Sequence, residues 1–138
     1  MSQNVTYLNP EGLAPAQGLY SQAGRVDGGR THFIAGQLSV GDDGEIAGVG
    51  DFETQFEQVF HNLGAVLDKL GMGFDDVVKF NTYLLDADLI DLFMVERAKR
   101  FPKLFRTDVY PPNTLLVVNR LVDARFMIEV EAVAVSAS

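Results

Sequence analysis

The residues best placed to do chemistry are two glutamates in an apolar segment near the C-terminus of this 138-residue chain. Residues 126–135 alternate as a strand does, so Glu129 and Glu131 share one face with a methionine and two valines. Carboxylates two residues apart repel each other unless water or a partner relieves them. A solvated face would account for the glutamates, but the apolar neighbours favour burial. We therefore expect this face to form a subunit contact that contains a pocket.

Other kinds of reactive site are excluded by composition. The chain has no cysteine, which removes thiol nucleophiles, disulfides and thiolate metal sites. Its two histidines, His32 in a predicted strand and His61 on a predicted helix, have no carboxylate at ligand spacing, so no histidine-rich metal centre is expected. The sequence contains no phosphate-binding loop, dinucleotide fingerprint or nucleophile elbow.

Net charge and hydropathy limit the classes of partner that this protein is expected to bind. Nineteen acidic against eleven basic residues give a net charge of −8, which disfavours nucleic acid as a general partner. No apolar run reaches the roughly 18 residues that a membrane span needs, and the polar first residues do not resemble a signal peptide. Because cysteine-free chains fit a reducing compartment, we expect a cytoplasmic protein, and the length predicts one domain over residues 1–138.

The spacing of apolar residues and the turn residues predict the strands and helices that position the glutamates. Residues 1–19 are predicted as a loop, and strands over 20–26 and 32–38 are predicted to form a hairpin across the Asp27-Gly28-Gly29 turn. Apolar residues then recur every three or four positions over 52–70, which indicates an amphipathic helix that Asp51 caps and Gly71 ends.

The second half of the chain repeats this combination of strand and helix. A β-branched and aromatic strand is predicted over 77–85, followed by a helix that Asp86 or Asp88 caps and that ends near Pro102. One face of this helix carries Leu89, Phe93, Met94, Arg97 and Phe101. Strands over 115–118 and 126–135 complete the order ββαβαββ. This order predicts an α+β fold, a mixed sheet with two helices on one face.

Several segments, in this order and spacing, resemble the Rid family, also called the YjgF family. They are residues 18–23 (GLYSQA), 34–37 (IAGQ), the helix with Phe52, Gln55 and Asn62-Leu63, 77–79 (VVK) and, most specifically, 128–134 (IEVEAVA). The resemblance covers nearly the whole chain. It implies a chorismate-mutase-like fold and a homotrimer with clefts between neighbouring subunits. It also implies hydrolysis of reactive imines or enamines to ammonia and a 2-oxo acid, with no metal or organic cofactor.

The same resemblance assigns site residues one by one. Tyr20 matches the family's pocket tyrosine, although the residue before it is Leu19 instead of proline. Ala35 and Gly36 match the segment that touches the ligand, where the family's serine hydroxyl is missing. Glu129 matches the glutamate associated with the hydrolytic water.

The main departure from the family pattern is Asn113. It occupies the position of the arginine that clamps the substrate carboxylate, and Leu115 occupies that of a nearby cysteine. Losing a charged hydrogen bond to a buried anion costs roughly 2–5 kcal/mol. Arg120 and Arg125 flank the last strand pair, and we expect both at its solvent end, where they would not replace the clamp.

Two functions remain open at this stage. One is a cofactor-free hydrolase in which Glu129 and Tyr20 are catalytic and the segments around Gly36, Asn113 and Leu115 hold the substrate. Because the arginine is missing, this substrate is expected to be neutral or to carry its anion elsewhere. The other is a non-catalytic trimer that binds a small molecule or regulates, keeping the cleft without the chemistry.

Overall fold

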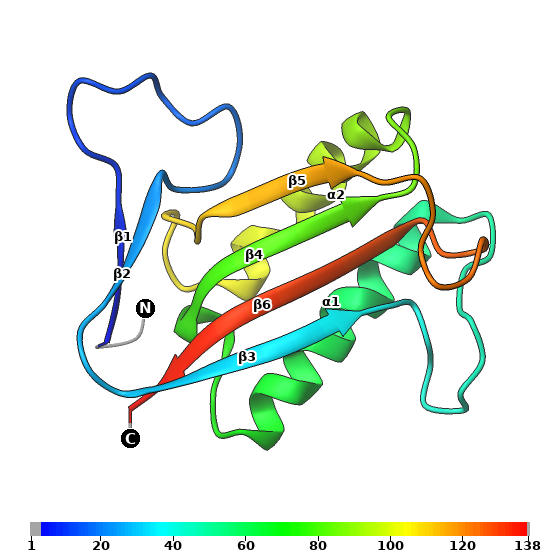
Figure 1. Ribbon diagram of the computed structural model, residues 1–138, viewed down its shortest axis with the longest axis horizontal. Helices are drawn as coiled ribbons and strands as arrows, with labels where there is room; N and C mark the ends of the chain where they lie inside the picture. Colours follow the sequence, from blue (N-terminus) through cyan, green and yellow to red (C-terminus); the bar gives the residue numbers. More distant parts are fainter. Residues whose placement is uncertain (1–3, 138) are drawn as a thin grey trace.

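A computed structural model describes residues 4–137, which fold into a four-stranded sheet covered on one face by two helices (Figure 1). The sheet order is β3 (Arg30–Gln37), β6 (Ile128–Ser136), β4 (Val77–Leu84) and β5 (Asn113–Val117). The β3–β6 and β6–β4 pairs are antiparallel, and β4–β5 is parallel. The predicted α+β fold with a mixed sheet is confirmed.

The first helix, α1 (Phe52–Lys69), begins and ends as its sequence predicts. The Asp51 carboxylate accepts a hydrogen bond from the Thr54 amide at 3.3 Å, and Gly71 follows the helix with a positive φ of 77°. Residues spaced three and four apart pack against the sheet. The buried side chains of α1 are Phe52, Gln55, Phe56, Val59, Phe60, Leu63 and Leu67.

The second helix, α2 (Leu89–Leu104), lies beside α1 on the same face of the sheet (Figure 1). Asp88 is its N-cap residue, and Asp86 accepts a hydrogen bond from the Asp88 amide at 2.8 Å. Phe93 and Phe101 join an aromatic cluster with α1. Between α1 and the start of β4 lies one short 3-10 turn, η1 (Phe74–Asp76).

The predicted hairpin between residues 20–26 and 32–38 is wrong. β2 (Ala23–Val26) pairs instead with β1 (Val5–Leu8), a strand that lies in the stretch predicted as loop. Packing explains the difference, because Val5 and Tyr7 of β1 bury Val135 at the end of β6. The Tyr7 hydroxyl also donates to the Val77 carbonyl at 2.7 Å. The observed order therefore has one more strand at its start than ββαβαββ.

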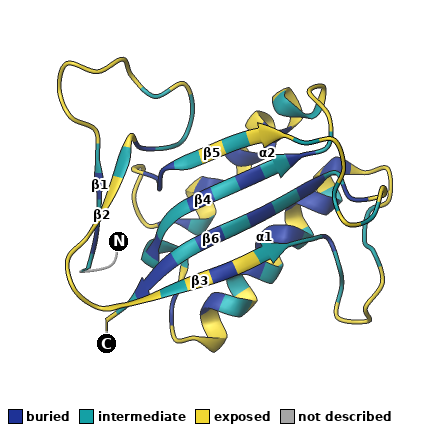
Figure 2. Cartoon of the chain, in the orientation of Figure 1, coloured by how far each residue is buried: buried dark blue, intermediate teal, exposed yellow. Residues whose placement is uncertain are grey.

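The face of the sheet away from both helices is called here the open face. Along β6 the predicted alternation is present, with Ile128 and Val130 fully buried and Glu129 and Glu131 half-buried (Figure 2). The open face also presents large apolar groups, among them Phe33, whose exposed fraction is 82%. It thus mixes apolar, aromatic and carboxylate side chains.

Candidate functional site

A β-bulge in β3 brings Gly36 against Glu129. The register between β3 and β6 shifts between Ile34 and Gln37, so one extra residue lies opposite β6 there. This extra residue turns Gly36 toward the open face, where a Cβ on it would lie only 2.2 Å from the Glu129 Oε2. The neighbouring Ala35 carbonyl accepts a hydrogen bond from the Gln37 side chain at 3.0 Å. We call Ala35, Gly36 and Glu129 the bulge group.

The two glutamates of β6 have different surroundings. Tyr83 on β4 donates a short hydrogen bond from its hydroxyl to the Glu131 carboxylate, and this bond raises the pKa of Tyr83. Glu129 has no hydrogen-bond or ion-pair partner within residues 4–137, and burial, followed by the charge of Glu131, raises its pKa. A raised pKa makes a carboxylate a better base. Glu129 therefore has the chemical features of a proton acceptor.

Tyr20 lies on the helix side of the molecule, next to α2. The Arg97 guanidinium carbon lies 5.9 Å from the centroid of the Tyr20 ring and 5.0 Å from that of Phe93. The Tyr20 hydroxyl accepts a long hydrogen bond of 3.4 Å from the Gln17 amide. Sequence reasoning missed Arg97, counting it with the apolar face of its helix. The signal was present, since a cation on such a face requires a reason.

The segment that carries Tyr20 runs from α2 to the starts of β4 and β5. At one end, a Cβ on Gly18 would lie 2.3 Å from Arg97 Nη2. At the other end, a Cβ on Gly24 would lie 2.8 Å from the Val78 carbonyl oxygen of β4 and 3.5 Å from Cδ of Pro112, the residue before Asn113. Tyr20 itself contacts the buried arginine, and the residues after it lead to the start of β4. We call Tyr20, Arg97 and Asn113 the tyrosine group.

Asn113 opens β5, and its side chain is already engaged. Its Oδ1 accepts a hydrogen bond from the hydroxyl of buried Thr82 at 2.8 Å. Asn113 pairs with Phe80 and Leu115 with Thr82, so both face the helices, and Leu115 packs against the core. The amide nitrogen of Asn113 is the part left to meet a ligand.

Arg120 and Arg125 are both exposed, and each is bonded to groups close by in the chain. Arg120 donates to the backbone carbonyls of Leu121 and Val122 at 3.2 and 3.5 Å. Arg125 forms an ion pair of 2.8 Å with Asp123, and this arginine holds the pKa of Asp123 well below its usual range. Both guanidinium groups are therefore occupied at the surface.

The bulge group and the tyrosine group lie on opposite faces of the sheet. Asn113 pairs with Phe80 and Phe80 with Ala132, which lies three residues along β6 from Glu129. With strands about 4.8 Å apart and residues about 3.3 Å apart, Asn113 and Glu129 are roughly 14 Å from each other in the plane of the sheet. A single chain does not present both groups to one small ligand.

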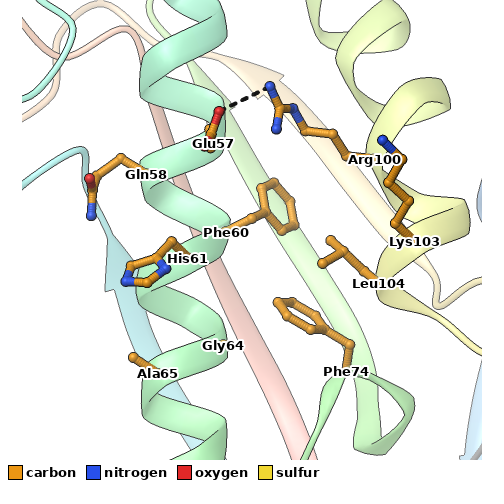
Figure 3. A pocket seen from close by; sticks show the side chains of 10 residues that line it. All are labelled: Glu57, Gln58, Phe60, His61, Gly64, Ala65, Phe74, Arg100, Lys103 and Leu104. Carbon is orange, nitrogen blue, oxygen red and sulfur yellow. Dashed lines mark ion pairs between the residues drawn. The ribbon is translucent and has the colours of Figure 1, made fainter.

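A hollow in the described part of the chain lies elsewhere, between α1 and α2 (Figure 3). Its volume is about 620 Å³, and the exposed His61 is one of the residues that line it. Arg100 at its edge is bound to Glu57 at 3.3 Å. A smaller hollow of about 290 Å³ lies beside Tyr20 under the loop of residues 9–22. Only the smaller one meets a residue of the candidate site.

In residues 4–137 no three His, Asp or Glu side chains gather closely enough to hold a metal ion. Within the same range, neither helix has the length and apolar character to cross a membrane.

The fold and the two residue groups define an α+β domain with a candidate small-molecule site, and comparison with known proteins gives its family. The family model described as endoribonuclease L-PSP matches residues 11–136. A RutC family protein of Pyrococcus horikoshii is 34% identical over 118 residues, covering 85% of this chain and 86% of that protein. The chain belongs to the Rid family, as its motifs predict.

Solved structures agree with this assignment. The Rid family protein YyfB of Yersinia pestis has a TM-score of 0.86 and 29% identity, covering 96% of this chain and 99% of that one. TdcF of E. coli, solved with bound serine, has a TM-score of 0.70 and 26% identity, covering 94% of both chains. These neighbours confirm the expected Rid fold.

Proposed function

We propose that this protein is a cofactor-free hydrolase that converts reactive imines or enamines into carbonyl compounds and ammonia. The observation that carries the proposal is the half-buried Glu129 carboxylate, which has a raised pKa, has no partner in the described chain and lies against the bulge at Gly36. Membership of the Rid family supports a general function of this kind.

The reaction needs only water and a proton acceptor. Water adds to the imine carbon, forming a C–O bond, while Glu129 takes a proton from that water and the imine nitrogen gains one. The hydroxyl proton then passes to the nitrogen as the C–N bond breaks, so ammonia leaves and a carbonyl remains. An enamine first becomes an imine by protonation at carbon. No electrons are exchanged, so neither oxidant nor reductant is required.

The ligand site is proposed to lie between chains. Because the bulge group and the tyrosine group of one chain are on opposite faces, a cleft holding both needs the bulge group of one copy and the tyrosine group of another. The open face, with exposed Phe33, offers the surface on which copies would meet. We propose a homotrimer with one small-molecule cleft at each contact between neighbours.

The decisive experiment replaces Glu129 by glutamine, which keeps the shape and removes the base. Imines made in place by an amino-acid oxidase serve as substrates, and ammonia release above the spontaneous rate is measured. Glu129→Gln should abolish turnover and leave the circular dichroism and the assembly mass unchanged. Turnover equal to that of the wild type would remove Glu129 from the mechanism.

The pH profile of the same assay tests the protonation state. Because the base acts ionised, turnover should rise with pH, with a midpoint above the usual carboxyl pKa of 4.5. Glu131→Gln is the matched variant. It removes a charge that raises the pKa of Glu129, so its rising limb should move to lower pH while turnover persists.

One observation favours the non-catalytic alternative. The Asn113 side chain accepts from Thr82, and Ala35 has no hydroxyl, so two ligand contacts of the family pattern are missing. A trimer that binds small molecules without turning over any imine would support this function instead.

A further inference from the structure

The hollow between α1 and α2 is separate from the residues assigned so far to the imine chemistry. The described residues that line it include no member of the bulge group or of the tyrosine group, and it lies in the helix layer, whereas Glu129 is on the open face (Figure 3). Its volume of about 620 Å³ is within the range of pockets that hold small organic molecules. The hollow therefore requires its own explanation.

Aromatic side chains form the floor of this hollow. Phe60 of α1 and Phe74 of η1 have their ring centroids 6.3 Å apart, and Leu104 of α2 points toward both rings (Figure 3). The Phe60 ring also makes an edge contact with Phe80 of the sheet at 5.8 Å, so the core holds the floor in place. A floor that is fixed before a ligand arrives lowers the cost of binding.

The α1 side of the hollow is kept open by two small residues. A Cβ at Gly64 would lie 3.2 Å from Cε2 of Phe74, so the glycine allows that ring to reach the floor. A glycine inside a helix is destabilising relative to alanine, and this contact gives its physical reason. The next residue, Ala65, is exposed and lines the same hollow. No long side chain of these two positions fills the space above the rings.

Lys103 carries the charge at the rim that is not compensated. Arg100 and Glu57 bond to each other at 3.3 Å, and Arg100 also bonds to Glu53 and Glu96. Within residues 4–137, by contrast, no carboxylate lies at ion-pair distance from Lys103, which is exposed. The α2 wall of the hollow therefore offers a free ammonium group beside an apolar floor.

A neighbouring acidic loop determines the end of the hollow at which an anion is favoured. The loop of residues 41–45 has three carboxylates and lines a second hollow, of about 460 Å³, which shares Gln58 and His61 with the first. The net charge of −8 also repels anions in general. A negative group is thus favoured only at the α2 wall, beside Lys103, and disfavoured near His61.

We propose that the hollow between α1 and α2 is a second ligand site, which takes a small aromatic carboxylate. The ring of the ligand lies on Phe60 and Phe74, and its carboxylate accepts a hydrogen bond from the Lys103 ammonium. One ammonium is a point charge and matches a ligand with a single negative group. The buried ring supplies the affinity, and the ammonium supplies the preference for the anion over a neutral analogue.

An NMR titration of the ¹⁵N-labelled full chain tests this site, with 3-phenylpropanoate and its neutral amide, 3-phenylpropanamide, as ligands. Backbone amide shifts should change and saturate at residues 57–65 and 100–104. The acid should bind at least about threefold more tightly than the amide, as expected for one partly exposed ion pair. Lys103→Gln should make the two affinities equal by weakening the acid alone.

Lys69→Gln is the matched control for Lys103→Gln. It removes the same charge from an exposed lysine of α1 that does not line the hollow, so it should keep the preference for the acid. Equal affinities of the wild type for acid and amide would overturn the inference. The same holds for shift changes that do not saturate, and for a preference that Lys69→Gln reduces as much as Lys103→Gln.

Ala65→Phe tests the position of the ring. Its side chain would occupy the hollow and should abolish the shift changes caused by both ligands, while the circular dichroism and the assembly mass stay unchanged because position 65 is exposed. Binding that persists in Ala65→Phe would overturn the site. A lower assembly mass in this variant would show that copies of the chain meet at this face, and would also overturn it.

Glu129→Gln separates this inference from the hydrolase proposal. The variant should bind 3-phenylpropanoate like the wild type, because Glu129 does not line the hollow. Loss of binding in Glu129→Gln would place the ligand in the proposed cleft and reject the second site. Intact binding in a protein that hydrolyses no imine would uphold the second site and reject only the hydrolase.

Discussion

Gly36 fixes how closely the backbone approaches the base. In Gly36→Ala the new methyl group would lie 2.2 Å from Glu129 Oε2, so the carboxylate has to move away from the bulge. The atoms that must yield, Oε2, Cδ and Cγ, all belong to the flexible Glu129 side chain, so the fold should persist while turnover falls at least about tenfold, as expected for a misplaced base. Turnover and thermal unfolding measured together check this.

Gly73→Ala is the matched control for Gly36→Ala. No atom lies within 4 Å of a Cβ at position 73, and its φ of −134° suits any residue. Gly73→Ala should therefore keep the turnover of the wild type. Full activity in Gly36→Ala would show that the position of the carboxylate does not matter.

The residues of the candidate site were predictable to different degrees. Glu129 and Gly36 stand in segments whose alternation and family motifs are readable in the sequence, and the structure brings them together. Arg97 was placed on the correct helix face, but periodicity does not tell whether a distant loop covers a cation. That information lies in the contact with Tyr20, 77 positions earlier, which only the folded chain provides.

Among the elements, those with long and regular patterns were predicted well. The helix α1 and the strands β4 and β6 have enough apolar residues at fixed spacing to identify them. β1 was missed because four residues are too few to show an alternation. Its partner was then misassigned, since the Asp27-Gly28-Gly29 turn indicates where the chain reverses, but the strand that pairs with β2 is set by packing on Val135.

At the scale of elements, Gln55 joins α1 to the start of β6. Its fully buried Nε2 donates to the carbonyls of Gly48 and Arg125 at 3.1 and 2.9 Å, and its Oε1 accepts from the Met127 amide at 2.8 Å. Gln55→Met keeps the size of the side chain and removes these bonds. Each buried group left without a partner costs about 1–3 kcal/mol, so the free energy of unfolding should fall by at least about 2 kcal/mol.

Urea unfolding at one protein concentration measures this loss. Gln58→Met, on the same helix, is the matched control. Within residues 4–137 the amide of Gln58 bonds only to the Asn62 side chain, and its replacement should change the free energy of unfolding by less than about 1 kcal/mol. Equal losses in both variants would show that the links to β6 add nothing to stability.

At the scale of the whole molecule, the open face predicts assembly. An exposed fraction of 82% for Phe33 is far higher than a large aromatic ring normally keeps unless a partner covers it. Light scattering should therefore give about three times the chain mass of 15.1 kDa. Phe33→Glu should give the mass of one chain, because a charge at the contact would be buried without a partner.

Val122→Glu is the matched control for the assembly experiment. Val122 is also exposed, at 76%, but lies outside the sheet, so this variant should assemble like the wild type. A wild type of single-chain mass would contradict the shared clefts.

The placement of the bulge group and the tyrosine group on opposite faces has a genetic consequence. In the proposed ring, every chain contributes Glu129 to the cleft with one neighbour and Tyr20 to the cleft with the other neighbour. A subunit with a lesion in only one of these halves damages a single cleft, so mixed rings lose activity in proportion to the defective share. Two defective alleles with lesions in different halves would complement each other. Some mixed rings would contain a cleft formed by the intact half of one mutant subunit and the intact half of the other.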